Sequence, residues 1–508
     1  MARFRVLLLI VILLLVGLMS LYFQDPWLWR RYTNTFLQLA GSEPRLLRPN
    51  EVVAGDGSFD IPTASADRRT VTDLALDAAE DFAARFDSHA LIVIHRGRIQ
   101  TEWYGDGWDA ASLTQSQSMH KSLLALLVGA AIEDGKIGSA EDPVARYIPQ
   151  WEDDPRGDIS LRELMMMSSG LAQYEFTLNP FTDDFKWLYS GNTQTVVLRT
   201  PMADWAPGSR FDYNNINSEL LGTVLENATG KRYSELLEKY LWKHIGGDDA
   251  RVWVDSEFGN AFTSCCLMAT ARDWARIGLL MMNRGQINGT QIVSGRWIDE
   301  MVTQSPVSKW YGLQTWLAFE EEVNPRAEVV SAGGAYSRSE PFLAPDVYFF
   351  SGRGAQRVYV VPSRELVIVR LGPALGPQPL RPGWDNAYIV NGVIRGIDEL
   401  NKQRRQRAIE ARPRPPVNRD ADLGADVLQE ADAPEGAPMP PDVPDDTVPA
   451  NAPEYSLQPE PPSTPEDIRA TFPAYPPEVE EPPPQAPPPQ APPPQDSPPQ
   501  DSVDAPQP

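Results

Sequence analysis

The chain has 508 residues, with 45 basic and 69 acidic side chains and a formal net charge of −24. A protein that binds nucleic acid needs a clustered basic face, so this balance argues against a nucleic-acid partner. Its two cysteines, Cys265 and Cys266, are adjacent, and an ordinary disulfide between neighbours is geometrically strained. The cysteines and the four histidines show no metal-ligand spacing, and we expect no metal and no cofactor.

The N-terminus begins with a short basic segment, residues 1–5, and continues as an apolar run over residues 6–23. A run of about 18 residues is close to the minimum for a helix that crosses a bilayer. The run lacks the small residues of a signal-peptide cleavage site, and aromatic residues typical of a membrane interface follow it. We therefore predict a transmembrane anchor, with the lipid bilayer as a partner and residues 24–64 as a linker. The alternative is a helix buried in a core.

The positive charges that flank this run are nearly balanced, with Arg3 and Arg5 before it and Arg30 and Arg31 after it. The positive-inside rule therefore gives only a weak orientation. We place the rest of the chain on the periplasmic side of the inner membrane.

Residues 65–400 are predicted to form one globular domain. Its pattern opens with a short helix and a hairpin, continues through a long section rich in helices, and returns to strands before a last helix. The predicted helices are 78–86, 118–133, 160–167, 194–200, 217–228, 234–243, 269–283, 294–304 and 386–400, and the predicted strands are 90–95, 98–103, 315–319, 347–350, 356–361 and 366–371. Strands at both ends of the domain indicate an α+β fold, in which a single antiparallel sheet is flanked by helices and joined to a helical lobe.

Ser118 and Lys121 lie one helical turn apart at the head of a nearly all-apolar helix. Residues three apart share a helix face, so the hydroxyl and the amine are expected to meet. Burial favours a neutral amine, which accepts a proton from the serine, and the helix N-terminus favours developing negative charge. The alternative is that Ser118 caps a core helix and Lys121 extends to the surface. His120 lies on a different face and is a poor base for this serine.

Two further patterns carry polar groups near predicted element ends. Tyr213 and Asn215 stand two apart in a loop, where one can move a proton and the other can bind an amide. An asparagine-rich turn that caps the next helix is the alternative. The glycine-rich segment 350–356 lets backbone approach a ligand and present an N–H donor, although taken alone it is better explained by a plain bulge or turn.

The last region, residues 401–508, holds about 30 of the 49 prolines, and the part of it after Arg412 carries most of the net negative charge. Such a composition does not pack a core, so we predict a disordered acidic tail with polyproline II stretches. A solvated spacer is favoured over a segment that docks on a proline-binding module, and any partner of the tail is unknown.

Ser118-x-x-Lys121, Tyr213-x-Asn215 and the glycine-flanked strand 350–356, in this order, resemble the serine β-lactamase and penicillin-binding-protein superfamily. The nearest branch is the class C β-lactamase-related enzymes, which include esterases and 6-aminohexanoate-dimer hydrolases. The segments 142–149, 161–171 and 205–211 support the resemblance, which covers residues 65–400.

The resemblance implies that Ser118 is acylated and that Lys121 and Tyr213 share proton transfer. Asn215 would orient the substrate, and the backbone N–H groups of Ser118 and Gln356 would form the oxyanion hole. Tyr174 would line the pocket.

The third pattern departs from the superfamily, which has Lys or His, any residue and then Gly where this chain has Arg353, Gly354 and Ala355. Arg353 keeps a cation suited to a substrate carboxylate. Ala355 narrows the approach to the strand, so hydrolysis of a small amide or ester ranks above β-lactamase or DD-peptidase activity. A penicillin-binding sensor without turnover and a catalytically inactive tethered scaffold are the competing functions.

Overall fold

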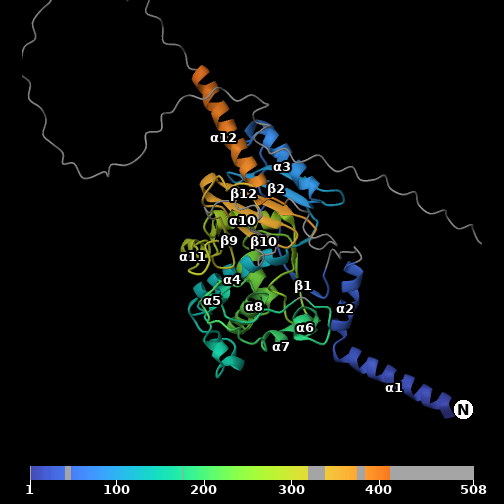
Figure 1. Ribbon diagram of the computed structural model, residues 1–508. Helices are drawn as coiled ribbons and strands as arrows, with labels where there is room; N and C mark the ends of the chain where they lie inside the picture. The colour runs from blue at the N-terminus through green and yellow to red at the C-terminus, as the bar shows by residue number, and fades with distance from the viewer. Residues whose placement is uncertain (1, 40–46, 176, 319–337, 374–383, 412–508) are drawn as a thin grey trace, which may run out of the picture. The chain divides into compact units, whose positions relative to one another are not determined.

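The computed structural model describes residues 2–39, 47–175, 177–318, 338–373 and 384–411. Within them the predicted α+β class is confirmed, because an antiparallel sheet is covered by helices and adjoins a helical lobe (Figure 1). The predicted tail lies outside the described residues, apart from its first residues, which continue the last helix.

A six-stranded antiparallel sheet forms the centre of the molecule. Its order is β3 (Arg98–Tyr104), β2 (Ala90–His95), β12 (Leu366–Leu371), β11 (Gln356–Val361), β10 (Tyr348–Gly352) and β9 (Trp316–Leu317). All residues of β2, β11 and β12 are buried, as expected of apolar strands that are covered on both faces.

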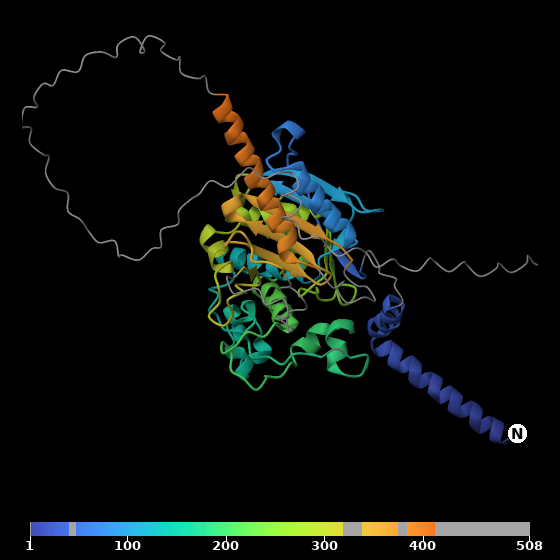
Figure 2. The same cartoon turned by 45° about the horizontal axis from the view of Figure 1, so that its top comes forward.

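Helices cover both faces of this sheet (Figure 2). Gly278 of α10 (Ala271–Met282) lies directly against Val358 and Val367, where a Cβ would overlap a valine side chain. On the other face, the Tyr359 hydroxyl donates to Asn386 Oδ1 of α12 (Asn386–Glu410) at 2.8 Å. Helix α3 (Asp73–Arg85) packs against α12. Side chains at 358 and 359 point to opposite faces because successive strand residues alternate.

A second antiparallel sheet corrects the prediction of a single sheet. It has the order β1 (Asn50–Val53), β5 (Ala250–Trp253), β6 (Leu267–Ala269) and β4 (Thr114–Gln115). A two-stranded ribbon, β7 (Gln286–Ile287) and β8 (Thr290–Gln291), was also not predicted. These strands have two to four residues each, too few for the alternation that reveals a strand.

The helical lobe centres on α4 (Lys121–Glu133), whose side chains are buried from Lys121 through Ala131. The other helices of this part of the chain are α5 (Leu161–Met165), α6 (Asp183–Tyr189), α7 (Thr193–Val197), α8 (Asn215–Thr229), α9 (Tyr233–Leu237) and α11 (Gly295–Met301). The predicted helix 118–133 differs at its start, because residues Gln117–His120 form a separate 3₁₀ turn, η2. Ser118 therefore lies in the turn that leads into α4.

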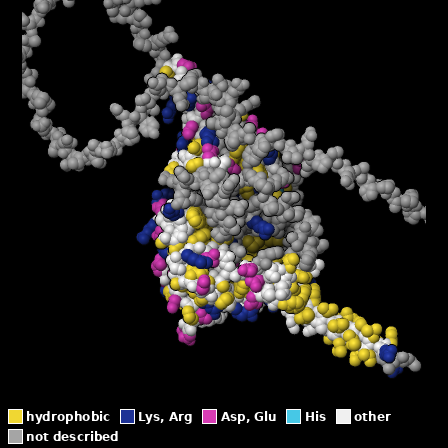
Figure 3. Space-filling view, viewed as in Figure 1, with side chains coloured by type: hydrophobic (Ala, Val, Ile, Leu, Met, Phe, Trp, Pro, Cys, Tyr) yellow, Lys and Arg dark blue, Asp and Glu magenta, His cyan; other side chains and the backbone are white. Residues whose placement is uncertain are grey.

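The N-terminal run forms α1 (Ala2–Gln24), and no described side chain in it is buried. Its exposed apolar side chains are visible along the helix in Figure 3. An 18-residue window reaches a mean hydropathy of 3.0, so α1 has the length and composition of a membrane-spanning helix or of a signal sequence.

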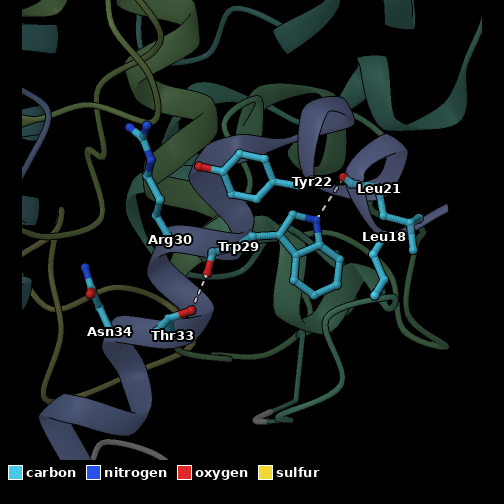
Figure 4. Close-up of a pocket in the computed structure, with 7 residues that line it drawn as sticks. All are labelled: Leu18, Leu21, Tyr22, Trp29, Arg30, Thr33 and Asn34. Atoms are coloured by element: carbon cyan, nitrogen blue, oxygen red, sulfur yellow. Dashed lines mark hydrogen bonds between the residues drawn. The ribbon is translucent and has the colours of Figure 1, made fainter. Parts of the chain in front are cut away.

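Part of the predicted linker is folded. Helix α2 (Pro26–Leu39) follows α1, and a hollow between the two is lined by residues such as Leu18, Trp29 and Arg30 (Figure 4). Arg31 of α2 is buried and donates to four carbonyl oxygens, those of residues 189, 190, 254 and 255. Burial lowers the pKa of Arg31 to about 10.

Strand β1 also lies inside the predicted linker and pairs with β5 along its whole length. At the other end, α12 continues to Glu410, beyond the predicted boundary at residue 400. The exact domain limits therefore stay a prediction, while regular secondary structure extends past both.

We predict that Gly129→Ala destabilises the fold by about 1–3 kcal/mol, because a Cβ there would overlap the Trp297 indole. The Trp297 ring cannot move freely, since its Nε1 donates to Ala125 O at 2.9 Å. Denaturant unfolding measures the cost. In a Trp297→Leu background the same substitution should cost clearly less, and an equal cost in both backgrounds contradicts this packing.

Candidate active site

The Ser118 hydroxyl and the Lys121 amine meet, as the spacing predicts. Lys121 Nζ lies 3.1 Å from Ser118 Oγ. Ser118 is half-buried in η2, where a 3₁₀ geometry places side chains three residues apart above one another. The residue before it, Gln117, adopts a left-handed conformation with φ 49°, an uncommon conformation outside glycine that is often found at functional sites. The turn thus presents the serine beside a lysine.

Lys121 is fully enclosed, with 1% of its surface exposed. Its Nζ also donates to Asn215 Oδ1 at 2.8 Å and to the Ser264 carbonyl oxygen at 2.5 Å. Three uncharged oxygens therefore surround the amine. None of these three hydrogen bonds is with a carboxylate. Burial lowers the pKa of Lys121 from 10.5 to about 7, although the more distant Glu219 carboxylate acts in the opposite direction. Near neutral pH, a substantial fraction of the amine is therefore uncharged.

Glu219 fixes the backbone that carries the Ser264 carbonyl. This buried carboxylate accepts hydrogen bonds from Thr263 N at 3.1 Å and Ser264 N at 3.0 Å. Burial raises the pKa of Glu219, while these hydrogen bonds act to lower it. Both backbone N–H groups bind the same side chain, and Glu219 belongs to α8. The backbone at residues 263–264 is therefore fixed to α8.

Tyr213 joins the pair from the loop before α8. Lys121 Nζ lies 5.2 Å from the centre of the Tyr213 ring, and the ring stacks on Trp316 with centroids 5.5 Å apart. Burial raises the pKa of Tyr213 to about 12, and a hydrogen bond with Ser118 partly opposes this effect. The phenol is therefore protonated at neutral pH and is in contact with the serine.

The hairpin between β10 and β11 lies against η2, the turn that holds Ser118. A Cβ at Gly352 would overlap the Ser116 carbonyl oxygen, so only glycine permits this approach. The connecting turn holds Arg353, which is exposed, and Gly354, with φ 77°. Gln356 begins β11 fully buried, and its side chain both donates to and accepts from the backbone of residue 372. The side chain of Gln356 is thus occupied structurally.

Tyr174 lies apart from the contacts that join Ser118, Lys121 and Tyr213. Its hydroxyl donates to Val196 O at 3.2 Å and accepts from Thr200 Oγ1 at 3.1 Å. Its ring stacks on Trp187 with centroids 6.5 Å apart. These contacts fix Tyr174 against α6 and the segment around α7, and its described hydrogen bonds are not to Ser118 or Lys121.

Sequence reasoning missed two groups that shape this site, the Ser264 carbonyl and the Glu219 carboxylate. A backbone carbonyl leaves no trace in a sequence. Glu219 does leave one, because an acidic residue stands in an otherwise apolar stretch of helix at 219–225. Among the described residues, no group of three or more histidine, cysteine or acidic side chains is arranged to hold a metal ion.

Known proteins resemble this chain in sequence and in fold. Residues 76–389 match the model of the Beta-lactamase family. The chain belongs to that family. A curated relative, the 6-aminohexanoate-dimer hydrolase of Paenarthrobacter ureafaciens, is 29% identical over 370 residues, which cover 67% of this chain and 89% of the relative. The family match and the similarity to this hydrolase show that the chain is a member of a β-lactamase-fold hydrolase family.

Two solved structures share the fold. A Bacillus anthracis protein provisionally assigned as a 6-aminohexanoate-dimer hydrolase superposes with a TM-score of 0.52 at 20% identity, covering 71% of this chain and 92% of its own. A Bacteroides dorei protein provisionally assigned as a β-lactamase gives 0.51 at 19% identity, covering 66% and 100%. The resemblance to the serine β-lactamase and penicillin-binding-protein superfamily is thus confirmed.

The buried lysine predicts a specific dependence of stability on pH. The pKa of Lys121 is about 7 in the folded chain and 10.5 when exposed, so the unfolded chain binds more protons between these values. The destabilisation caused by Lys121 is therefore complete below pH 7 and disappears as the pH rises toward 10.5. We expect the stability of Lys121→Met relative to wild type to be higher at pH 6 than at pH 9.5, by more than about 1 kcal/mol. Denaturant unfolding of both proteins measures this, and a pH-independent difference contradicts it.

Proposed function

We propose that this protein is a membrane-anchored serine hydrolase that cleaves an amide or ester of a small molecule or peptide through an acyl-enzyme. The observation that carries the proposal is the contact between Ser118 Oγ and the enclosed amine of Lys121. An amine with a pKa near 7 is matched to general-base catalysis at neutral pH.

In the acylation step, the neutral Lys121 amine takes the Ser118 proton as Oγ attacks the substrate carbonyl carbon. The oxyanion that forms accepts from the backbone N–H groups of Ser118 and Gln356. Tyr213 then passes a proton to the leaving nitrogen or oxygen, the bond from it to carbon breaks, and the serine ester remains. The phenol recovers its proton from the Lys121 ammonium, so the step conserves charge.

Deacylation repeats these roles with water as the nucleophile. Tyr213 and Lys121 together remove a proton from the water, whose oxygen attacks the ester carbon. The bond between this carbon and Ser118 Oγ breaks, and the serine regains a proton. Asn215 and Ser264 keep the amine in place through both steps, since each accepts a hydrogen bond from it.

The surroundings of Tyr213 support a substrate with an apolar portion. Aromatic rings adjoin it, with Tyr311 6.2 Å away and Trp316 5.5 Å away between ring centroids. Arg353, exposed in the β10–β11 turn, is suited to a carboxylate at the far end of such a substrate. The relative that hydrolyses a 6-aminohexanoate dimer supports a linear amide with an aliphatic spacer and a carboxylate end.

The membrane anchor in this proposal is α1, with the hydrolase domain on the periplasmic side. Its length and the absence of buried side chains support this assignment. Asp25 and the following helix α2 would then connect the anchor to the hydrolase domain. Asp25 and Arg31 bind the backbone of that domain at residues 190–191 and 254–255. A cleaved signal sequence would instead release the domain.

We expect Ser118→Ala and Lys121→Ala each to lower kcat for a chromogenic short-chain ester at least about 10²-fold in the full-length protein. Ser112→Ala, which removes an exposed hydroxyl bonded to Asp109, serves as the matched control and should retain activity.

Intact-mass measurement with a penicillin or a fluorophosphonate separates the competing functions. The proposal expects a fluorophosphonate adduct on wild type that is absent from Ser118→Ala, together with multiple turnovers of the ester. A permanent penicillin adduct without ester turnover indicates a sensor, and full activity of Ser118→Ala refutes the proposed nucleophile.

A further inference from the structure

The two cysteines form a disulfide between neighbouring residues, Cys265 and Cys266. The bond closes a small covalent ring that contains the peptide group between them, and Cys266 is held in a left-handed conformation with φ 79°. From the sequence, a disulfide between two adjacent cysteines was judged geometrically strained and was not predicted. It lies immediately after Ser264, the residue whose carbonyl oxygen binds the Lys121 amine.

Backbone carbonyls on both sides of the disulfide bind the nucleophile segment. The Cys265 carbonyl oxygen lies 2.7 Å from His120 Nδ1, and the Leu267 carbonyl oxygen accepts from Ser116 N at 2.8 Å. With the Ser264 contact, three carbonyls within four residues hold the stretch that contains Ser118. The covalent ring is therefore built into the backbone that positions the candidate base.

The surroundings of the disulfide leave one sulfur-bearing residue partly accessible. Cys266 is 5% exposed and packs with Trp253, Phe262 and Met268, whereas Cys265 is only half-buried beside this cluster. The chain has no other cysteine. Any effect of a thiol reagent on activity therefore reports on this bond alone.

We propose that the Cys265–Cys266 disulfide is a redox-sensitive positioning element for Lys121, and that a dithiol reductant lowers hydrolase activity by opening it. The inference rests on the proposed roles of Ser118 and Lys121.

The opening consumes one dithiol. One thiolate of the reductant attacks the sulfur of Cys265, the bond between the two cysteine sulfurs breaks, and Cys266 leaves as a thiolate that takes up a proton. The second thiolate of the reductant then attacks its own sulfur in the mixed disulfide. Cys265 leaves as a thiolate and is protonated, and the reductant departs as a cyclic disulfide. An oxidant of the disulfide class reverses both exchanges.

Opening the ring changes the backbone around Ser264. A side chain such as that of Cys266 disfavours the left-handed conformation, so the freed residue is expected to leave it. The backbone change displaces the Ser264 carbonyl oxygen. The Lys121 amine then loses one hydrogen-bond acceptor, and water enters beside it. Glu219 still binds the backbone N–H groups of Thr263 and Ser264, so the displacement is confined to the carbonyl side.

The test compares the full-length protein before and after treatment with dithiothreitol, using ester hydrolysis for activity and alkylation with intact mass for the redox state. We expect the doubly alkylated protein to show kcat at least about five-fold lower, with KM changed less, and the rising limb of kcat against pH moved to higher pH. Reoxidation should restore activity. The Cys265→Ser/Cys266→Ser variant should match the reduced protein and ignore dithiothreitol.

Two results overturn the inference without touching the proposed function. One is unchanged activity of a protein that mass spectrometry shows to be reduced, and the other is a disulfide that dithiothreitol fails to open in the folded chain. A failure of the proposed function is distinct, because the oxidised protein would then lack Ser118-dependent turnover. Circular dichroism and thermal unfolding establish that the double variant is folded, and the wild-type reduction remains decisive if it is not.

Discussion

The enclosure of one amine governs the rest of this site. An ammonium group buried among neutral oxygens loses its hydration without gaining an ion pair, so the uncharged form is favoured. Asn215, Ser118 and the Ser264 carbonyl satisfy the hydrogen-bonding capacity of Lys121 without stabilising its charge as a carboxylate would. The Glu219 carboxylate instead accepts hydrogen bonds from the backbone N–H groups of Thr263 and Ser264 and from the Thr263 hydroxyl. The pKa of Lys121 is therefore about 7, and an uncharged amine is available at neutral pH.

The fold assembles the enclosure from segments that are far apart in the chain. The turn η2 precedes α4, Asn215 begins α8, and the stretch 263–267 leads into β6. Pairing of β4 with β6 aligns that stretch with the approach to Ser118, and the end of β10 closes the other side at Gly352. Because β10 of the large central sheet packs against η2 and β4 of the short four-stranded sheet leads into it, a shift in either sheet would be transmitted to Ser118.

The sequence predicted the parts of this arrangement that depend on local spacing. The strands at 90–95, 356–361 and 366–371 have the predicted limits, since long apolar runs between turn residues define them clearly. Ser118 and Lys121 were found together because a three-residue spacing places them on one face. The strands of the second sheet were missed, as two to four residues show no period, and the Ser264 carbonyl and the vicinal disulfide depend on tertiary contacts.

The protonation state of the Lys121 amine at neutral pH decides whether it can accept the Ser118 proton. The direct measurement is a pH titration of the folded protein containing ¹³C-labelled lysine, with the Lys121 resonance assigned by comparison with Lys121→Met. We expect a titration midpoint near 7, well below the 10.5 of an ordinary lysine. A midpoint above 10 would show that the amine is charged at neutral pH and would contradict its role as the base.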